Sequence, residues 1–240
     1  FLERRFRGFN GLNLTYETRE GMIKHETDYD LSDASDYEPE KRGSLEAQIA
    51  NLADEIAYDA HDVDDGLRAE LFTVGDLEAL SIWPGLCEGI GWRQGDPFTS
   101  LIRRELVREL IGQSVIDVLQ QTNINLETAQ IATPQHVQTY PTNLVSYSPE
   151  FGAKVRELKR FLFERMYRHY RLVRMQVKAE RFISELFNAY MTEPRMLPEE
   201  AQERMDESPL PRVIADYIAG MTDRYALQEW EKLFDPYGRA

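Results

Sequence analysis

The segment 44–66 constrains the fold most, because its apolar and its acidic residues both repeat with the period of an α-helix. Ser44 can cap the start of that helix, although Ala47 stands where a full capping box has Glu. Apolar residues recur along one side, at Ile49, Leu52, Ala53, Ile56, Ala60, Val63 and Leu67. The pattern predicts an amphipathic helix that packs one face on a core.

An acidic row lies on the other side of this helix. Asp54, Tyr58 and Asp62 follow at intervals of four residues, so they share one face, with the two carboxylates about 12 Å apart along the axis. This is roughly the distance from a reacting phosphate to the far side of a sugar. A solvated outer face would show the same pattern, so a ligand site and a plain surface both remain open. The aromatic Tyr58 among acids favours the site.

Other helices are predicted along the chain, and no segment has a convincing strand pattern. We expect helices at 14–25 with Thr15 as N-cap, from Gly75, at 100–122, at 151–191 as one or two pieces, and at 212–234. Loops are expected at 27–43, in the glycine-rich stretch 83–97, and in the connector 123–150. The fold class is therefore all-α.

Bulk composition limits the function classes. The formal net charge of −14 disfavours non-specific binding of nucleic acid by the whole surface. The single cysteine, Cys87, fits a reducing compartment, and we expect a cytoplasmic protein. No apolar run approaches the ~20 residues that span a bilayer, so no membrane partner is expected.

A basic stretch stands out against this acidic background. Between Lys154 and Arg181 the chain has ten Lys or Arg against three Glu, a local charge of +7. A solvated helix paired to acidic neighbours would explain it. A site for a polyanion, either a triphosphate or a nucleic acid, would explain it as well.

Four sets of residues together resemble the deoxyguanosine triphosphate triphosphohydrolase (dGTPase) family of HD-domain phosphohydrolases. They are Gly11–Glu17 with Lys24-His25-Glu26, Glu46 to Asp62, Phe161–Glu164 with Tyr167-Arg168-His169, and Asp216–Tyr225. The resemblance implies an HD-type helical architecture. It also implies hydrolysis of a deoxynucleoside triphosphate to the deoxynucleoside and triphosphate, a divalent metal ion such as Mn or Mg, and a homo-oligomer.

The resemblance also assigns roles to residues. Asp54 matches the family's last metal ligand, Tyr58 a tyrosine packed on the deoxyribose, and Asp62 a carboxylate that receives the 3′-hydroxyl. Lys24 resembles a lysine that reaches the phosphates, and arginines among Arg165, Arg168 and Arg171 are candidates for the same contact.

The chain departs from the family pattern at the metal site. The family's first His and its His-Asp pair precede the Gly-Leu-Asn-Leu-Thr stretch, so they are expected upstream of Phe1, together with the catalytic residues. His61-Asp62 is not that pair, because Val63-Asp64-Asp65-Gly66 follows it instead of a Leu-Gly-His run. We therefore expect a C-terminal portion without the metal-ligand helices, which hydrolyses nothing by itself, since a lone Asp binds a divalent ion weakly.

The predicted organisation is one domain in two parts, with residues 1–122 as the remainder of the HD-type core and 151–240 as its C-terminal helical part. Two other functions remain open. The chain could be a non-catalytic module that binds nucleotides or single-stranded nucleic acid, or a structural piece for oligomerisation.

Overall fold

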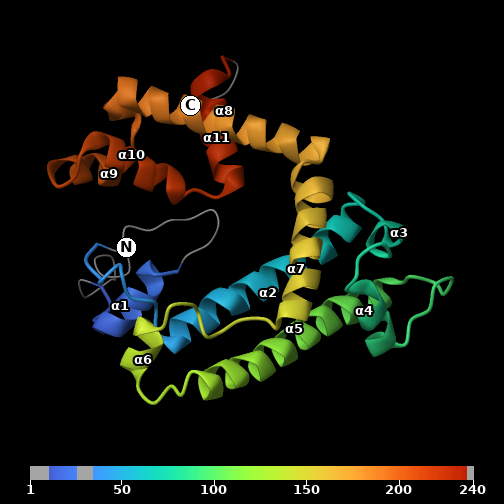
Figure 1. The fold of residues 1–240 in the computed structure, drawn as a ribbon. Helices are drawn as coiled ribbons and strands as arrows, with labels where there is room; N and C mark the ends of the chain where they lie inside the picture. Colours follow the sequence, from blue (N-terminus) through green and yellow to red (C-terminus); the bar gives the residue numbers. More distant parts are fainter. Residues whose placement is uncertain (1–10, 26–34, 237–240) are drawn as a thin grey trace. The chain divides into compact units, whose positions relative to one another are not determined.

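The computed structural model describes residues 11–25 and 35–236, and within these ranges it contains helices and no strand. The predicted all-α class, of the HD type, is confirmed. Two compact units divide the chain, residues 1–166 and 167–240, and each is described by itself (Figure 1). No helix among the described residues is both long and apolar enough to cross a membrane.

The first unit is built around three long helices. Its elements are α1 (Tyr16–Ile23), α2 (Leu45–Arg68), α3 (Val74–Leu77), α4 (Trp83–Ile90), α5 (Ser100–Thr128), α6 (Pro134–Thr139) and α7 (Pro149–Leu162). Helix α2 packs along α5 and also against α7, while α4 covers another part of α5 (Figure 1). A π-helical turn, Phe163–Tyr167, follows α7.

The caps predicted for the first two helices are confirmed. The Thr15 side chain accepts a hydrogen bond from the backbone N–H of Thr18, and that of Ser44 accepts one from Ala47. Each cap satisfies a backbone donor that has no partner inside its helix. The sequence signal therefore placed the starts of α1 and α2 correctly.

The core of the first unit lies where α2, α5 and α7 meet the α3–α4 segment. Its fully buried members include Ala60, Val63, Leu77, Leu106 and Leu162. Gly66 allows the closest approach, because a β-carbon at this position would lie 2.1 Å from the ring of Phe72. That ring packs edge-on against Phe161 of α7, with 5.0 Å between the centroids. Gly66 thus lets the chain after α2 fold back under α7.

Four predicted segments differ from the structure. The stretch 83–97, expected as a loop, contains α4, whose last turn ends at Gly91 with a left-handed φ of 68°. The helix expected at 100–122 continues to Thr128, and the connector holds α6. The helix expected at 212–234 is two helices, because Gly220 ends the first and Thr222 caps the second.

The second unit has its own small core. Its elements are α8 (Tyr170–Thr192), a 3₁₀ turn (Pro194–Met196), α9 (Glu199–Glu203), a second 3₁₀ turn (Arg204–Asp206), α10 (Leu210–Ala219) and α11 (Asp223–Phe234). Helix α8 packs against α10 and α11 through buried Leu186, Tyr190, Val213 and Ile214. The rings of Tyr190 and Tyr217 meet edge-on at 5.6 Å.

Candidate functional site

The predicted row on α2 runs from the surface into the interior. The side chain of Asp54 is 67% exposed and Tyr58 is 57% exposed, whereas Asp62 is buried. The first two residues therefore present a carboxylate and an aromatic ring on an open helix face. Asp62, two turns after Asp54, lies close to the core.

A histidine that the sequence did not single out lies beside Asp54. The His25 ring follows the end of α1, and its Nε2 is 3.9 Å from Oδ2 of Asp54. Its Nδ1 contacts Oδ1 of Asn51, and the Asn51 amide donates to the carbonyl of Lys24 at 3.5 Å. Asn51 thereby fixes the ring with Nε2 toward Asp54. Ligand spacing could not reveal this pair, because the two residues lie far apart in sequence and meet only through packing of α1 on α2.

Lys24, predicted to bind substrate, is buried and fully engaged. Its ammonium donates to Oε1 of Glu20 at 2.8 Å and to the carbonyls of Glu38 at 3.1 Å and Lys41 at 3.0 Å. The other carboxylate oxygen of Glu20 accepts from Gln138 on α6 at 3.0 Å. Three contacts use all three donors of the ammonium. A phosphate contact by Lys24 would require it to leave this network.

Asp59 is the buried counterpart of the exposed row. It follows Tyr58 directly, is 8% exposed, and its Oδ2 has no hydrogen-bond partner among the described residues. Burial raises the pKa of Asp59 to about 7; the Lys159 ammonium opposes that shift, and Glu55 and Asp62 add to it. Burial likewise raises the pKa of the nearby Tyr147, with Glu55 and Asp59 as further causes. The α2–α7 contact therefore holds a carboxyl that titrates near neutral pH.

Comparison with known proteins shows what this chain is similar to. The family described as phosphohydrolase-associated domain matches residues 145–232. Proteins named deoxyguanosinetriphosphate triphosphohydrolase-like are 41% identical in Geobacter metallireducens, over 99% of this chain and 62% of the relative, and 42% identical in Azoarcus sp., over 97% and 62%. Over nearly its whole length the chain is therefore similar to dGTPase-like proteins. It spans about 62% of the length of these curated relatives.

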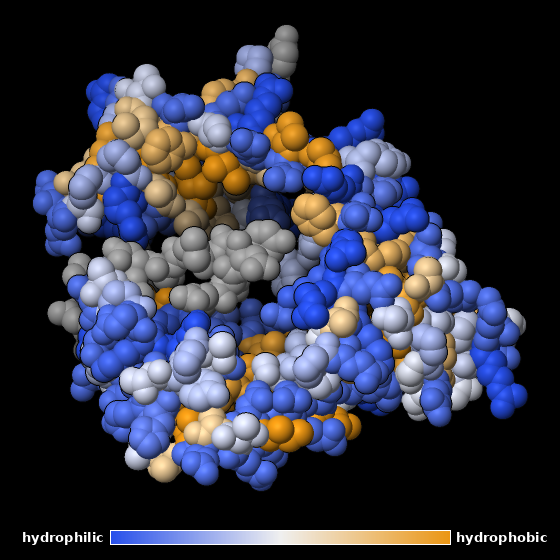
Figure 2. Space-filling model, in the orientation of Figure 1, coloured by the Kyte–Doolittle hydropathy of each residue, from blue (hydrophilic) through white to orange (hydrophobic). Residues whose placement is uncertain are grey.

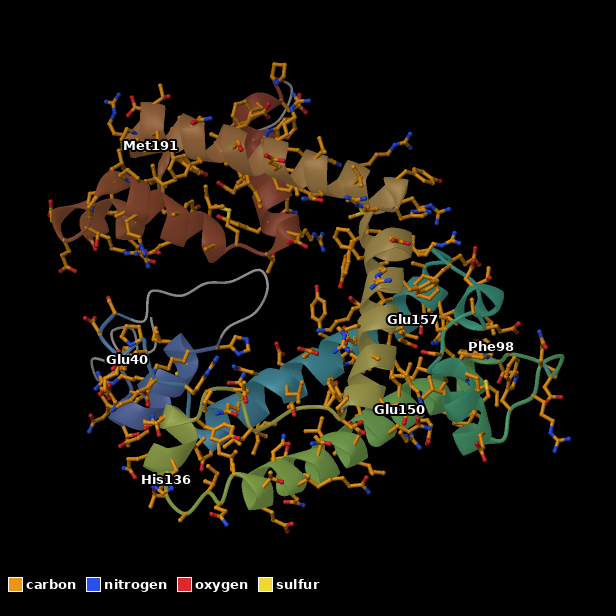
Figure 3. The ribbon with its side chains drawn as sticks, viewed as in Figure 1. Glu40, Phe98, His136, Glu150, Glu157 and Met191 are labelled. Atoms are coloured by element: carbon orange, nitrogen blue, oxygen red, sulfur yellow. The ribbon has the colours of Figure 1, made fainter. Side chains whose placement is uncertain are left out.

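The chain does not complete a metal site within its described residues. No group of three or more His, Cys, Asp or Glu side chains that could hold an ion occurs among them. Asp54 and His25 supply one oxygen and one nitrogen, and tight binding of a divalent ion needs more preorganised ligands. His136 lies on α6 (Figure 3), His61 is on the exposed side of α2, and His169 caps α8.

Part of the basic stretch is paired with acids. Lys154 lies 3.0 Å from Glu150, Lys159 2.8 Å from Glu55, Arg165 3.6 Å from Asp76 and Arg181 2.9 Å from Glu185. Figure 3 shows Glu150 and Glu157 on the same helix, α7, and Glu157 accepts from the backbone N–H of Ser81 at 2.9 Å. Four of the ten basic residues in this stretch therefore form ion pairs with acidic neighbours. At these four positions the pairs agree with the alternative of a solvated helix paired to acidic neighbours.

A pocket of about 290 Å³ between α4 and α5 lies elsewhere in the first unit. Gly89, Ile90, Glu105, Arg108 and Glu109 line it. None of the predicted site residues does, so this pocket adds nothing to the candidate site on α2.

Proposed function

We propose that this chain contributes the substrate-binding helix of a deoxynucleoside triphosphate triphosphohydrolase. The observation that carries the proposal is the open Asp54–Tyr58 face of α2 in a chain whose relatives are named dGTPase-like. In the proposed reaction water attacks the α-phosphorus and the bond to the 5′-oxygen breaks. Deoxynucleoside and triphosphate leave; the oxygen of water stays on phosphorus, one of its protons ends on the departing 5′-oxygen, and the other stays on the triphosphate or passes to solvent.

Each residue of the row has one proposed task. Asp54 would give one ligand to a divalent ion, Mn or Mg, which when bound activates water and offsets charge on the phosphoryl oxygens. Tyr58 would pack on the deoxyribose and exclude a 2′-hydroxyl. Asp62 would accept a hydrogen bond from the 3′-hydroxyl. Residues other than these must supply the remaining metal ligands and the basic contacts to the phosphates.

A chimera tests the proposal without any assumption about where the natural protein begins. These 240 residues replace the matching segment of the Geobacter metallireducens relative, and triphosphate release from dGTP is measured with Mn. We expect turnover within tenfold of the parent relative. A folded chimera that binds metal and releases no triphosphate would contradict the proposal.

The 240-residue chain alone gives the complementary result. We expect no hydrolysis of dGTP with Mn, because the described residues offer two metal donors at most near Asp54. The same protein preparation should show its full helical signal by circular dichroism. Robust triphosphate release by the isolated chain would show that its residues complete the site in a way the described structure does not.

Sugar discrimination tests Tyr58 separately. In the chimera, Tyr58→Ala should increase the use of GTP relative to dGTP, since the ring no longer occupies the space of a 2′-hydroxyl. Tyr58→Phe keeps the ring and should keep the preference. If GTP is used as poorly after Tyr58→Ala as before, Tyr58 is not the residue that excludes ribose.

The local +7 of residues 154–181 favours a second candidate, a module that binds nucleotides or single-stranded nucleic acid. Binding of a single-stranded oligonucleotide would then weaken steeply with salt, because cations on the protein displace counterions. An affinity that does not change with salt would count against this candidate. Self-association is proposed alongside either function.

A further inference from the structure

The α2 segment of the candidate site has the wrong charge to hold a triphosphate by itself. Four acidic side chains occur between Asp54 and Asp62, while the proposed substrate is a polyanion. A cation of the protein must therefore lie beside this segment. Lys24, which the family resemblance indicates, would first have to leave the three acceptors of its ammonium.

Lys159 of α7 brings a cation to the open face of α2. Its ammonium lies 2.8 Å from Oε1 of Glu55, which directly follows Asp54 and stands three residues before Tyr58. The Lys159 and Glu55 side chains are 36% and 37% exposed, so the pair lies at the surface rather than in the core. The same ammonium opposes the rise in the pKa of Asp59, which shows that its charge acts on the α2 carboxyls.

This pair differs from the other ion pairs of the basic stretch. Lys154 and Arg181 each pair with a residue four positions away on their own helix, and Arg165 contacts α3. Lys159 is the member of this set that reaches α2. Glu55 is its one ion-pair partner in the described part of the chain, so donors of the ammonium remain for phosphate oxygens. Figure 2 shows mainly hydrophilic residues where Figure 1 draws α7.

We propose that Lys159 binds the triphosphate of the substrate, with Glu55 holding its ammonium beside the open face of α2. The inference rests on the proposed function and adds a phosphate contact to the residues that the family resemblance indicates. A partly exposed ion pair is weak, so the ammonium can turn to a more highly charged anion at little cost. Because the released triphosphate keeps all three phosphate groups, inorganic triphosphate should occupy the same contact.

Kinetics of the chimera with the Geobacter metallireducens relative test this contact. Lys159→Met should raise both KM for dGTP and the inhibition constant of inorganic triphosphate roughly tenfold or more, because a charge-assisted contact is lost. Lys159→Arg keeps the charge and should stay within about threefold of the parent. The matched control is Arg160→Met, at the next, exposed residue of α7, which should leave both constants unchanged.

The partner variant separates a ligand contact from a purely structural ion pair. Glu55→Gln breaks the same pair but releases the ammonium, so it should keep or lower both constants. Either variant should lower the melting temperature by only a few degrees, because the pair is partly exposed. If Glu55→Gln and Lys159→Met raise the constants equally, the pair only holds α7 against α2 and the proposal is wrong.

Failure of this proposal can be told apart from failure of the proposed function. An active chimera in which Lys159→Met changes neither KM nor the inhibition constant would overturn the role of Lys159 and leave the hydrolase assignment standing. A folded chimera that binds metal and releases no triphosphate would overturn both.

Discussion

Two neighbouring regions of the first unit contain predicted substrate residues, and they differ in how far those residues are already satisfied. Lys24 and Glu20 form a buried ion pair whose side chains are 6% and 2% exposed, with further contacts to the 38–41 turn and α6. On α2, Asp54 and Tyr58 stand open on the surface. The same resemblance pointed to both regions.

The difference shows that a family match and a free functional group are separate properties. The buried Lys24 ammonium with its three acceptors stabilises the fold, because moving it would leave the Glu20 carboxylate buried without a cation. For the exposed Asp54 carboxylate, the one ion-pair contact among residues 11–25 and 35–236 is a histidine 3.9 Å away, so a ligand there would displace little. Variants in the two regions separate a stability role from a ligand role.

The largest expected effect is on stability, at Lys24. Lys24→Met should lower the free energy of unfolding by about 3–5 kcal/mol, because it leaves Glu20 buried without its cation. Chemical denaturation followed by circular dichroism measures this. The control is Lys41→Met in the exposed Lys41–Glu38 pair, which should cost less than about 1 kcal/mol. If Lys24→Met and Lys41→Met lower the free energy of unfolding equally, the buried pair stabilises the fold no more than the exposed one.

The next effect is on activity, at Asp54. In the chimera, Asp54→Asn should lower kcat/KM for dGTP at least 100-fold, about 2.7 kcal/mol of transition-state stabilisation, while the unfolding free energy changes by less than about 0.5 kcal/mol. Asp65→Asn is the matched control, since Asp65 is 63% exposed on the same helix. Normal turnover by the Asp54 variant would exclude it as a metal ligand.

A smaller effect is expected from pH, at Asp59. Its pKa of about 7 in the folded state exceeds the unfolded value near 3.8, so the folded state binds more protons between these values and stability falls as pH rises from 4 to 7. Between pH 5 and pH 8 the parent should lose about 2 kcal/mol of unfolding free energy through Asp59. Asp59→Asn should not show this loss. Parallel stability curves for the two proteins would show that Asp59 ionises normally.

Local signals in the sequence predicted the fold better than they predicted the site. Thr15 and Ser44 mark helix starts through bonds to residues three positions away, so the sequence contains all that is needed. Helix α4 was missed because its glycines argue for a loop, and only tertiary packing of Trp83 and Leu86 outweighs that preference. The break at Gly220 was missed because apolar spacing continues across it.

The candidate site was predictable only along one helix. The spacing of Asp54, Tyr58 and Asp62 gives their common face, whereas their exposure depends on what packs beside α2. The contact between His25 and Asp54, the engagement of Lys24 and the burial of Asp59 each join different elements of the fold. No periodicity within one segment reports such contacts.

The absent side chain at position 66 has one more consequence. The Phe72 ring occupies the space that a β-carbon at Gly66 would need, and the same ring packs on Phe161. The C-terminal end of α2 therefore contacts α7 through the Phe72 side chain. Even alanine at Gly66 would displace the Phe72 ring from Phe161 and weaken the packing of the segment that follows α2. The fold should therefore tolerate substitutions at the exposed Tyr58 more readily than alanine at Gly66, two turns further along α2.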